Sequence, residues 1–307
     1  MGFIMRLEKS NIYQPTELCF RLGLNVAGAN LAIFDDPDDP EAGLDIDFEI
    51  DKTIDETPNK SKITIWNVTP EIYTLLSEKG TGVELYGGFG RESLGLMFTG
   101  DIGNSTQAAG KITSTTNTGF LKIDQGKNNS GKNDIPTIIT CYDAGVKYQD
   151  QFISRSYKGL ISAEVIIRDC VNQMGIPYGR MDINNYPMVR DYVARGRCVT
   201  VLKDLTQRLG IKYNITNGIF NLVNPGQQVD TMGIVLNGDN SNRPELFEIR
   251  ENGKKGWKIE TSLLPFLNPA TYSLCDFESL RGTYQVYRVH LSGNNYGTKG
   301  ITEVYLE

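Results

Sequence analysis

NKSKITIWNVTPE (residues 59–71) decides the fold, because its apolar and polar side chains alternate before the chain enters a turn. Ile63 and Ile65 stand two residues apart, a period that is typical of a β-strand with one buried face. The same kind of pattern returns in VELYGGFG (residues 83–90), LMFTGDI (residues 96–102) and TIITCYDAG (residues 137–145). Strands of this kind separated by glycine-rich turns predict a β domain over residues 1–150.

One short helix is predicted between these strands. TPEIYTLLSEKG (residues 69–80) places Ile72, Leu75 and Leu76 at helical spacing. Thr69 is the expected N-cap, with proline at the first helical position and glycine at the stop. The first domain is therefore expected to be mainly β, with a single helix lodged between two strands.

An acidic stretch, FDDPDDPEAGLDIDFEIDKTIDE (residues 34–56), precedes these strands. Its first part lacks the ligand spacing and the central glycine of an EF-hand loop, so a proline-punctuated loop is favoured over a calcium site. Its second part alternates, with Leu44, Ile46, Phe48 and Ile50 on one face of a strand. The opposite face carries carboxylates toward water or a basic partner, and the candidate interface residues there are Asp45, Asp47, Glu49 and Asp51.

Residues 103–134 are poor in large apolar side chains and rich in Asn, Gly, Ser, Thr and Lys. Such a composition buries little surface, which predicts a long exposed hairpin or mobile loop at one rim of the domain. This segment is either solvated without a partner or an arm that contacts another protein. The candidate contact residues of the arm are Lys111, Lys122, Lys127 and Asn128.

The pattern changes near the middle of the chain, where helical periodicity replaces alternation. GLISAEVIIRDCVNQMGI (residues 159–176) places six apolar residues on one side of a helix, with Ser162 as the N-cap and Gly175 as the stop. TVLKDLTQRLGI repeats this periodicity, and residues 212–226 predict a hairpin that turns at an Asn-Gly pair. Residues 151–226 are therefore predicted to form a small α/β insert.

Charge and composition argue against several classes of protein. The 307 residues carry a net charge of −6 with a pI near 5.1, which argues against an electrostatically driven hold on nucleic acid. No apolar run is long enough to span a membrane and the first ten residues lack a secretory signal, so synthesis in the cytoplasm without membrane insertion is expected. Buried free thiols are expected for the five cysteines, Cys19, Cys141, Cys170, Cys198 and Cys275, because they form no CxxC pair.

Motifs for catalysis are weak throughout the chain. His290 is the single histidine, so a triad or a metal site would have to be built around it, and no GxSxG motif accompanies it. The glycines of YGGFGRESLG (residues 86–95) are faintly similar to those of a nucleotide-binding GxGxxG loop. Neither a helix nor a P-loop lysine follows them, so a strand and turn are favoured. The many acids leave a glycosidase pair open, although no Glu and Asp stand out. A non-enzymatic protein without a cofactor or metal is therefore expected.

The last part of the chain, residues 227–307, returns to strands and turns. It carries an LNP phrase, then a strand, then a glycine-tyrosine-valine phrase: Leu267, Asn268, Pro269, Gly282, Tyr284, Val286, Val289, His290, Gly293 and Gly297. Together with the strand phrases of the first domain, these residues resemble the baseplate hub, or tail hub, proteins of tailed bacteriophages, contractile injection systems and tailocins. The resemblance covers most of the chain and is more specific at both ends than in the middle.

The resemblance implies both a fold and an assembly. It implies two small β-barrel domains, at residues 1–150 and 227–307, flanking a mixed helix-hairpin module at residues 151–226. In the hub family a homotrimer forms a pseudo-sixfold ring that joins the tail tube to the central spike. The implied role is structural, in the virion tail at the baseplate, with the tube, the spike, the tape-measure protein and other baseplate components as partners.

Two other functions stay open. Fifteen tyrosines and long polar loops would suit a carbohydrate-binding or receptor-binding tail module, although aromatic side chains in strands more often belong to a core or an interface. A cell-wall-degrading tail enzyme is the other alternative, because acids are abundant. A ring component, a lectin and a lytic enzyme differ in what they bind and turn over, so they can be separated by assay.

Overall fold

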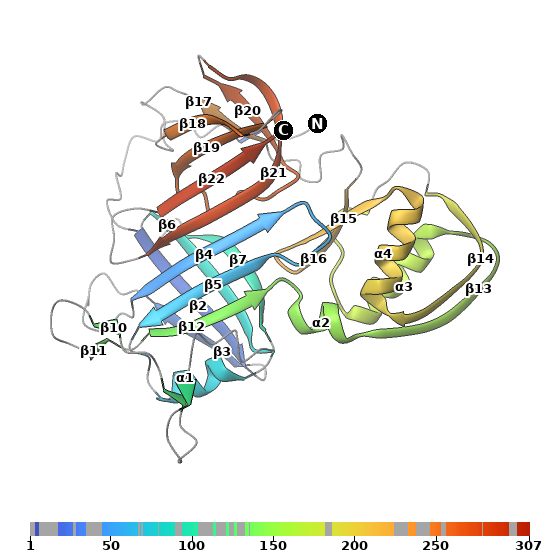
Figure 1. Ribbon diagram of the computed structural model, residues 1–307, viewed down its shortest axis with the longest axis horizontal. Helices are drawn as coiled ribbons and strands as arrows, with labels where there is room; N and C mark the ends of the chain where they lie inside the picture. Colours follow the sequence, from blue (N-terminus) through green and yellow to red (C-terminus); the bar gives the residue numbers. More distant parts are fainter. Residues whose placement is uncertain are drawn as a thin grey trace.

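The fold is known from a computed structural model. It describes residues 4–5, 18–26, 29–34, 45–66, 68, 70–78, 80–89, 94–103, 113–114, 121–122, 126–127, 133–134, 136–181, 186–223, 233–237, 246–252, 256–277, 279–294 and 300–307. Within these residues lie a 14-stranded sheet, several two-stranded sheets and a few helices (Figure 1). The chain is mainly β and has an insert of mixed structure, as the sequence predicts.

Both ends of the chain build the large sheet. Its N-terminal strands are β1 (Ile4–Met5), β2 (Leu18–Val26), β3 (Ala29–Phe34), β4 (Ile46–Thr53), β5 (Lys60–Trp66), β6 (Gly82–Phe89), β7 (Gly95–Ile102) and β12 (Pro136–Tyr142). Its C-terminal strands are β17 (Gly233–Asn237), β18 (Leu246–Asn252), β19 (Gly256–Ser262), β20 (Tyr272–Asp276), β21 (Arg281–Asn294) and β22 (Gly300–Leu306). The strand order is β1-β17-β20-β21-β4-β5-β12-β7-β6-β2-β3, and β22, β19 and β18 branch from β21.

Strand β21 joins the two ends of the sheet. Its first residues pair with β20, and its later residues pair with both β22 and β4. The antiparallel β4–β21 pairing runs from Arg288 opposite Thr53 to Asn294 opposite Asp47, and Figure 1 shows the two strands side by side. We call this pairing the seam. Among the described residues the sheet is continuous across the seam, so the division into two closed barrels stays a prediction.

One hydrophobic core lies under both ends of the sheet. In strand β4 the side chains of Ile46, Phe48 and Ile50 are each at most 1% exposed. Their burial confirms the alternation predicted for these residues. The C-terminal strands bury side chains in the same cluster: Ile259, Val286, Val289, Leu291, Val304 and Leu306. Each large apolar side chain contributes about 1.5–3 kcal/mol when fully buried. The two ends of the chain therefore stabilise one another through a shared core.

Helix α1 (Pro70–Ser77) lies between β5 and β6 in the chain, where the sequence predicts it. Leu76 is buried in the core of the sheet, and Ile72 packs against that core. Gly80 follows the helix with a φ of 79°, a left-handed conformation that glycine adopts without steric cost. The helix therefore closes one end of the core and then turns directly into β6.

The insert has its own core. It contains α2 (Gly145–Asp150), β13 (Phe152–Ser162), α3 (Ala163–Met174), β14 (Met188–Arg197), α4 (Cys198–Leu209), β15 (Lys212–Thr216) and β16 (Ile219–Val223). Apolar side chains of α3, α4 and the β15–β16 hairpin form a second buried cluster, separate from the core of the large sheet. In Figure 1 the insert projects from one side of the sheet. The domain boundaries drawn from the sequence stay a prediction.

The ends of α3 and the hairpin turn confirm the local predictions. The Ser162 side chain accepts a hydrogen bond from the backbone N–H of Glu164, and Gly175 ends the helix with a φ of 67°. Asn217 and Gly218 connect β15 to β16 with φ angles of 51° and 71°. Positive φ at both central residues is the geometry of the tight hairpin turn that Asn-Gly favours.

Strands β13 and β14 are absent from the sequence prediction. They pair antiparallel over most of their length, with an irregularity between Tyr157 and Leu160. Their exposed positions mix apolar, polar and charged side chains, so neither strand shows a clean alternation that would have revealed it. The two strands form a ribbon that extends the insert away from the large sheet (Figure 1).

Two further expectations concern the arm and the cysteines. Within residues 103–134 two short antiparallel pairs are described, β8 (Thr113–Ser114) with β9 (Leu121–Lys122) and β10 (Gly126–Lys127) with β11 (Asn133–Asp134).

The side chains of Cys141, Cys170, Cys198 and Cys275 are buried free thiols as predicted, and that of Cys19 lies outside the described set. Among the described helices, none is long and apolar enough to cross a membrane.

The seam gives the first testable prediction. Leu291 is fully buried in the shared core and lies opposite Ile50 across the seam. Leu291→Ala should lower the free energy of unfolding by about 2–5 kcal/mol, because truncation removes buried apolar surface and leaves a cavity. Urea unfolding followed by circular dichroism measures this change. The matched control is Ser292→Ala, on the opposite face of β21, and an unchanged midpoint for Leu291→Ala would contradict the shared core.

Candidate functional site

The four acids predicted to form an interface lie on or beside β4. Asp45 and Glu49 are exposed, whereas Asp47 and Asp51 are partly buried. Glu49 lies 4.0 Å from Lys62 of the neighbouring strand β5. The acids therefore do not form a uniform acidic face, because basic side chains of the adjacent strands stand among them. Whether they contact a partner stays a prediction.

Asp51 is held by two bases across the seam. Its Oδ1 accepts a hydrogen bond from Arg288 Nη2 at 2.7 Å and lies 3.1 Å from His290 Nδ1. The hydrogen bond with His290, with further help from Arg288, lowers the pKa of Asp51 to about 2. The same hydrogen bond raises the pKa of His290. The single histidine of the chain is thus part of an ion-pair cluster that links β4 to β21.

The cluster continues onto the neighbouring C-terminal strands. Lys258 on β19 forms an ion pair with Glu303 on β22, and the Tyr305 hydroxyl donates to Glu303 Oε2 at 2.8 Å. The guanidinium of Arg288 lies 5.1 Å from the centre of the Tyr305 ring, within the range of a cation–π interaction. These contacts tie β4, β21, β22 and β19 together on the face opposite the core. Their chemistry is that of a structural network.

The candidate residues of the arm can be placed only in part. Lys122 is in β9 and Lys127 is in β10, and the structure describes the pairing of both strands. Lys111 and Asn128 lie outside the described residues. A contact role for the arm therefore stays a prediction that rests on composition.

A buried polar junction connects the large sheet, the insert and the C-terminal LNP phrase. Lys52 follows Ile50 on the inward face of β4 and is fully buried, and its Nζ donates to Asn268 Oδ1 at 2.8 Å. Asn59 donates through Nδ2 to Asp143 Oδ2 and to the carbonyl of Ile215, both at 2.8 Å. These directional bonds place Asn268 of the LNP phrase and the β15 strand of the insert against the same end of β4 and β5.

Burial shifts the pKa values of both charged groups at the junction. Desolvation raises the pKa of Asp143 to about 7, although hydrogen bonds from Asn59 and the backbone N–H of Asn217 oppose this shift. Desolvation lowers the pKa of Lys52 to about 8, and the charge of Asp143 opposes that shift. A buried charge is costly unless it is hydrogen-bonded, so Lys52 depends on its bond to Asn268, and Asp143 keeps its proton to higher pH than an exposed aspartate does.

Of these junction residues only Asn268 stands out in the sequence, as part of the LNP phrase, and Lys52, Asn59 and Asp143 carry no predicted role. One signal was available, because Lys52 continues the period of Ile46, Phe48 and Ile50 on the buried face of the strand. A lysine at an inward position of a strand requires a polar partner in the interior. Its partner Asn268 is 216 residues away, and nothing in the pattern of β4 points to it.

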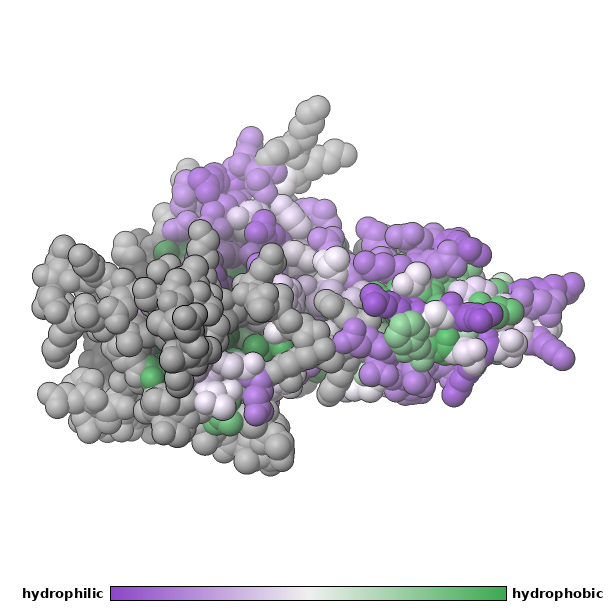
Figure 2. Space-filling model, turned by 60° about the horizontal axis from the view of Figure 1, so that its bottom comes forward, coloured by the Kyte–Doolittle hydropathy of each residue, from purple (hydrophilic) through white to green (hydrophobic). Residues whose placement is uncertain are grey.

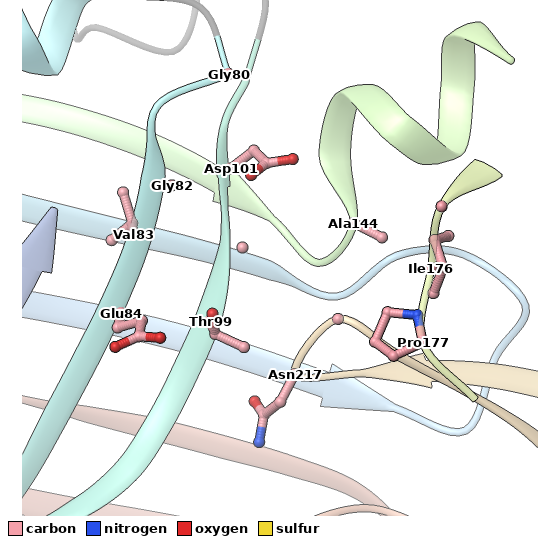
Figure 3. A pocket seen from close by; sticks show the side chains of 13 residues that line it. Gly80, Gly82, Val83, Glu84, Thr99, Asp101, Ala144, Ile176, Pro177 and Asn217 are labelled. Carbon is pink, nitrogen blue, oxygen red and sulfur yellow. The ribbon is translucent and has the colours of Figure 1, made fainter. Parts of the chain in front are cut away.

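A cleft of about 640 Å³ opens between the β6–β7 hairpin and the insert (Figure 3). One wall carries Glu84 and Asp101 on neighbouring strands, and the other wall includes Ile176, Pro177 and Asn217. Much of the lining is glycine and other small or apolar residues. Among the described residues, no group of three or more His, Cys, Asp or Glu side chains comes together as a metal site. The cleft lies between the large sheet and the insert.

Comparison with known proteins shows similarity at the level of fold. No protein-family model matches the sequence, and no curated protein matches it either. The 43 kDa tail protein of prophage MuSo2 from Shewanella oneidensis matches with a TM-score of 0.59 and 9% identity, over 94% of this chain and 98% of that chain. A tail protein from Neisseria meningitidis matches with a TM-score of 0.56 and 9% identity, over 94% of this chain and 96% of that chain.

A third solved structure comes from a secretion machine. It is an Escherichia coli protein described as a component of the type VI secretion system with structural similarity to the T4 bacteriophage tail proteins gp27 and gp5. The match has a TM-score of 0.59 and 10% identity, over 86% of this chain and 73% of that chain. The chain therefore shares its fold with phage tail proteins and with this secretion component.

The junction predicts how stability changes with pH. Between about pH 4 and 7 the folded protein holds a proton on Asp143 that the unfolded chain has released, because the folded pKa is about 7 and the ordinary value is 3.8. The free energy of unfolding should therefore fall as pH rises through this window. Asp143→Asn keeps an acceptor for Asn59 and Asn217 but does not titrate, so it should flatten this slope.

The measurement is chemical denaturation of both proteins at several pH values between 4 and 7. Asp204→Asn, which changes a more exposed acid on α4, is the matched control and should follow the slope of the unmodified protein. Groups such as His290 titrate in all three proteins, so only the difference between the curves reports Asp143. Curves of equal slope for Asp143→Asn and the unmodified protein would show that the carboxyl is ionised at the junction throughout the window.

Proposed function

We propose that this protein is a structural component of a phage tail or a phage-like injection machine, and that it acts there as a baseplate hub. The observation that carries the proposal is the extent of the fold similarity. It runs over 94% of this chain and nearly all of two phage tail proteins, so it includes the insert as well as the sheet. The match with a type VI secretion component supports the same kind of machine.

We propose that the chain divides as its sequence pattern predicts. Residues 1–150 and 227–307 form two barrel domains, and residues 151–226 form the insert between them. The seam supports this arrangement, because pairing β4 with β21 holds the two proposed barrels side by side within one subunit. Three subunits would then present six barrels in a closed ring, and such a ring can adapt a sixfold tube to a threefold spike.

The proposed partners are the tail tube and the central spike, with the tape-measure protein and other baseplate components around them. The location that follows is the virion tail, at the baseplate. Edge strands of the large sheet, such as β3, could be covered by a neighbouring subunit or by the stacked tube protein.

A structural role is favoured over a lytic or glycan-binding role. Asp51 contacts both His290 and Arg288 across the seam. The only histidine of the chain therefore takes part in a structural contact between β4 and β21. Tyr213 and Tyr148 hydrogen-bond to each other at 3.0 Å in the insert core, and Tyr213 stacks on Phe220. These tyrosines serve packing rather than a sugar platform.

The ring predicts a specific mass and specific partners. Purified protein should form a species of three times the 34.2 kDa chain mass, alone or when its spike protein is added. Mass photometry measures this directly, and co-purification with the tail tube and spike proteins of the same machine tests the contacts. Bovine serum albumin at equal concentration is the negative control for capture.

Other outcomes would support other functions. A subunit that stays single beside its spike and tube proteins would contradict the hub. Binding to defined glycans irrespective of assembly would identify a receptor-binding module. Release of soluble fragments from peptidoglycan, lost when a candidate acid is replaced by alanine, would identify a lytic enzyme.

A further inference from the structure

The ribbon of β13 and β14 has one face on the insert core and one face toward solvent. The inward face buries Ile153 and Ala194, which belong to the core cluster of the insert. The outward face carries four large apolar side chains with between 52% and 62% of their surface exposed: Phe152, Leu160, Met188 and Val193. The four side chains are spread along the length of the ribbon, and exposed apolar surface of this kind is a feature of interaction sites.

Basic side chains stand between these apolar residues. Lys158, Arg190, Arg195 and Arg197 are all exposed on the ribbon. Arg197 lies directly opposite Phe152 in the ribbon, with its guanidinium 5.9 Å from the centre of the ring. Figure 2 shows apolar residues set among hydrophilic ones over the insert. Aromatic residues, Met and Arg are the types enriched at protein interfaces.

Three acids among the described residues of the insert have polar partners of their own. Asp169 pairs with Arg155 at 2.7 Å, and Glu164 pairs with Arg168 at 2.7 Å. Asp191, the only acid within the two ribbon strands, accepts a hydrogen bond from the backbone N–H of Gly159 at 2.7 Å. Among the described residues, no ion pair reaches Arg190 or Arg195. The ribbon strands therefore carry more basic than acidic side chains, and Arg190 and Arg195 take no part in the described ion pairs of the insert.

Charge is divided unequally along the chain. Residues 151–226 contain ten Lys and Arg but five Asp and Glu, a net charge of +5. The whole chain has a net charge of −6, so the two β regions together carry −11. The basic insert of one copy is therefore complementary in charge to the acidic β regions of a neighbouring copy. Such a contact uses two different surfaces, which is the kind of interface that can close a ring.

We propose that the outward face of the β13–β14 ribbon docks on the acidic β regions of a second copy of this chain. The proposal rests on the proposed function, because it assigns a surface to the contact between subunits of the ring. A nucleic acid is a poorer fit, since it would use the basic residues and leave Phe152, Leu160 and Val193 in water. A protein surface with carboxylates around an apolar centre uses both kinds of side chain.

The experiment compares three double variants of the full chain by sedimentation velocity over a concentration series. Arg190→Glu/Arg195→Glu reverses charge on the outward face, and Leu160→Ser/Val193→Ser removes apolar surface there. Lys203→Glu/Lys212→Glu is the matched control, because it makes the same charge change in the same insert, on α4 and β15. All six residues are at least partly exposed, so thermal melting should confirm that each variant folds.

The unmodified protein should assemble, and its assembly should weaken as salt is raised. Both outward-face variants should raise the dissociation constant about tenfold or more, whereas the control should stay within about twofold of the unmodified protein. If the unmodified protein and both outward-face variants assemble equally well, the ribbon is overturned as the contact and the proposed ring stands. If the unmodified protein is a single subunit at every concentration, both alone and with its spike protein, the proposed ring and the ribbon contact are both overturned.

A last experiment distinguishes a protein partner from a nucleic acid. Adding a 30-base-pair DNA duplex tests whether the basic face takes phosphate instead of protein. Binding of the duplex that is lost only in Arg190→Glu/Arg195→Glu, without any self-assembly, would replace the second copy by nucleic acid. No binding of the duplex, together with self-assembly that depends on the ribbon, is the result expected.

Discussion

The pairing of β4 with β21 is the constraint on which the rest of the molecule depends. Strand β21 contributes backbone hydrogen bonds to strands from both ends of the chain, and its apolar residues lie in a core that neither end completes alone. On the outer face, Asp51 meets Arg288 and His290 across the same pairing. Backbone pairing, core packing and ion pairing thus coincide on two strands, so a shift in register would disturb all three together.

The buried junction of Lys52, Asn59, Asp143 and Asn268 complements the seam. Hydrophobic packing is not directional and would tolerate several placements of the insert on the sheet. Hydrogen bonds are directional, and unpaired polar groups in the interior are costly, so the junction selects one placement. The junction thereby fixes the β15–β16 end of the insert against the large sheet. A rigid placement matters for any surface that has to meet a second subunit.

Local features of this fold could be predicted from the sequence, and long-range ones could not. The buried face of β4, the Ser162 cap and the Asn-Gly turn follow from neighbouring residues, and the structure has them as predicted. The alternation in β4 specifies which side chains are buried but not which strand lies beside it. The partners of Asp51 therefore had no local signal. The sequence does not predict the β13–β14 ribbon for another reason. Its outward face mixes apolar and basic residues, so the strands lack the alternation of apolar and polar side chains that marks a strand.

The seam also sets an order of events during synthesis. Its ion pair joins residues 237 positions apart, so β4 is made long before β21 emerges. Until then β4 lacks its partner β21, and the apolar side chains that the C-terminal strands contribute to the shared core are missing. Contacts of such large sequence separation close slowly, and an open strand edge is prone to join foreign chains in the meantime. Charged side chains on an open strand oppose such pairing, and β4 carries Asp47, Glu49 and Asp51.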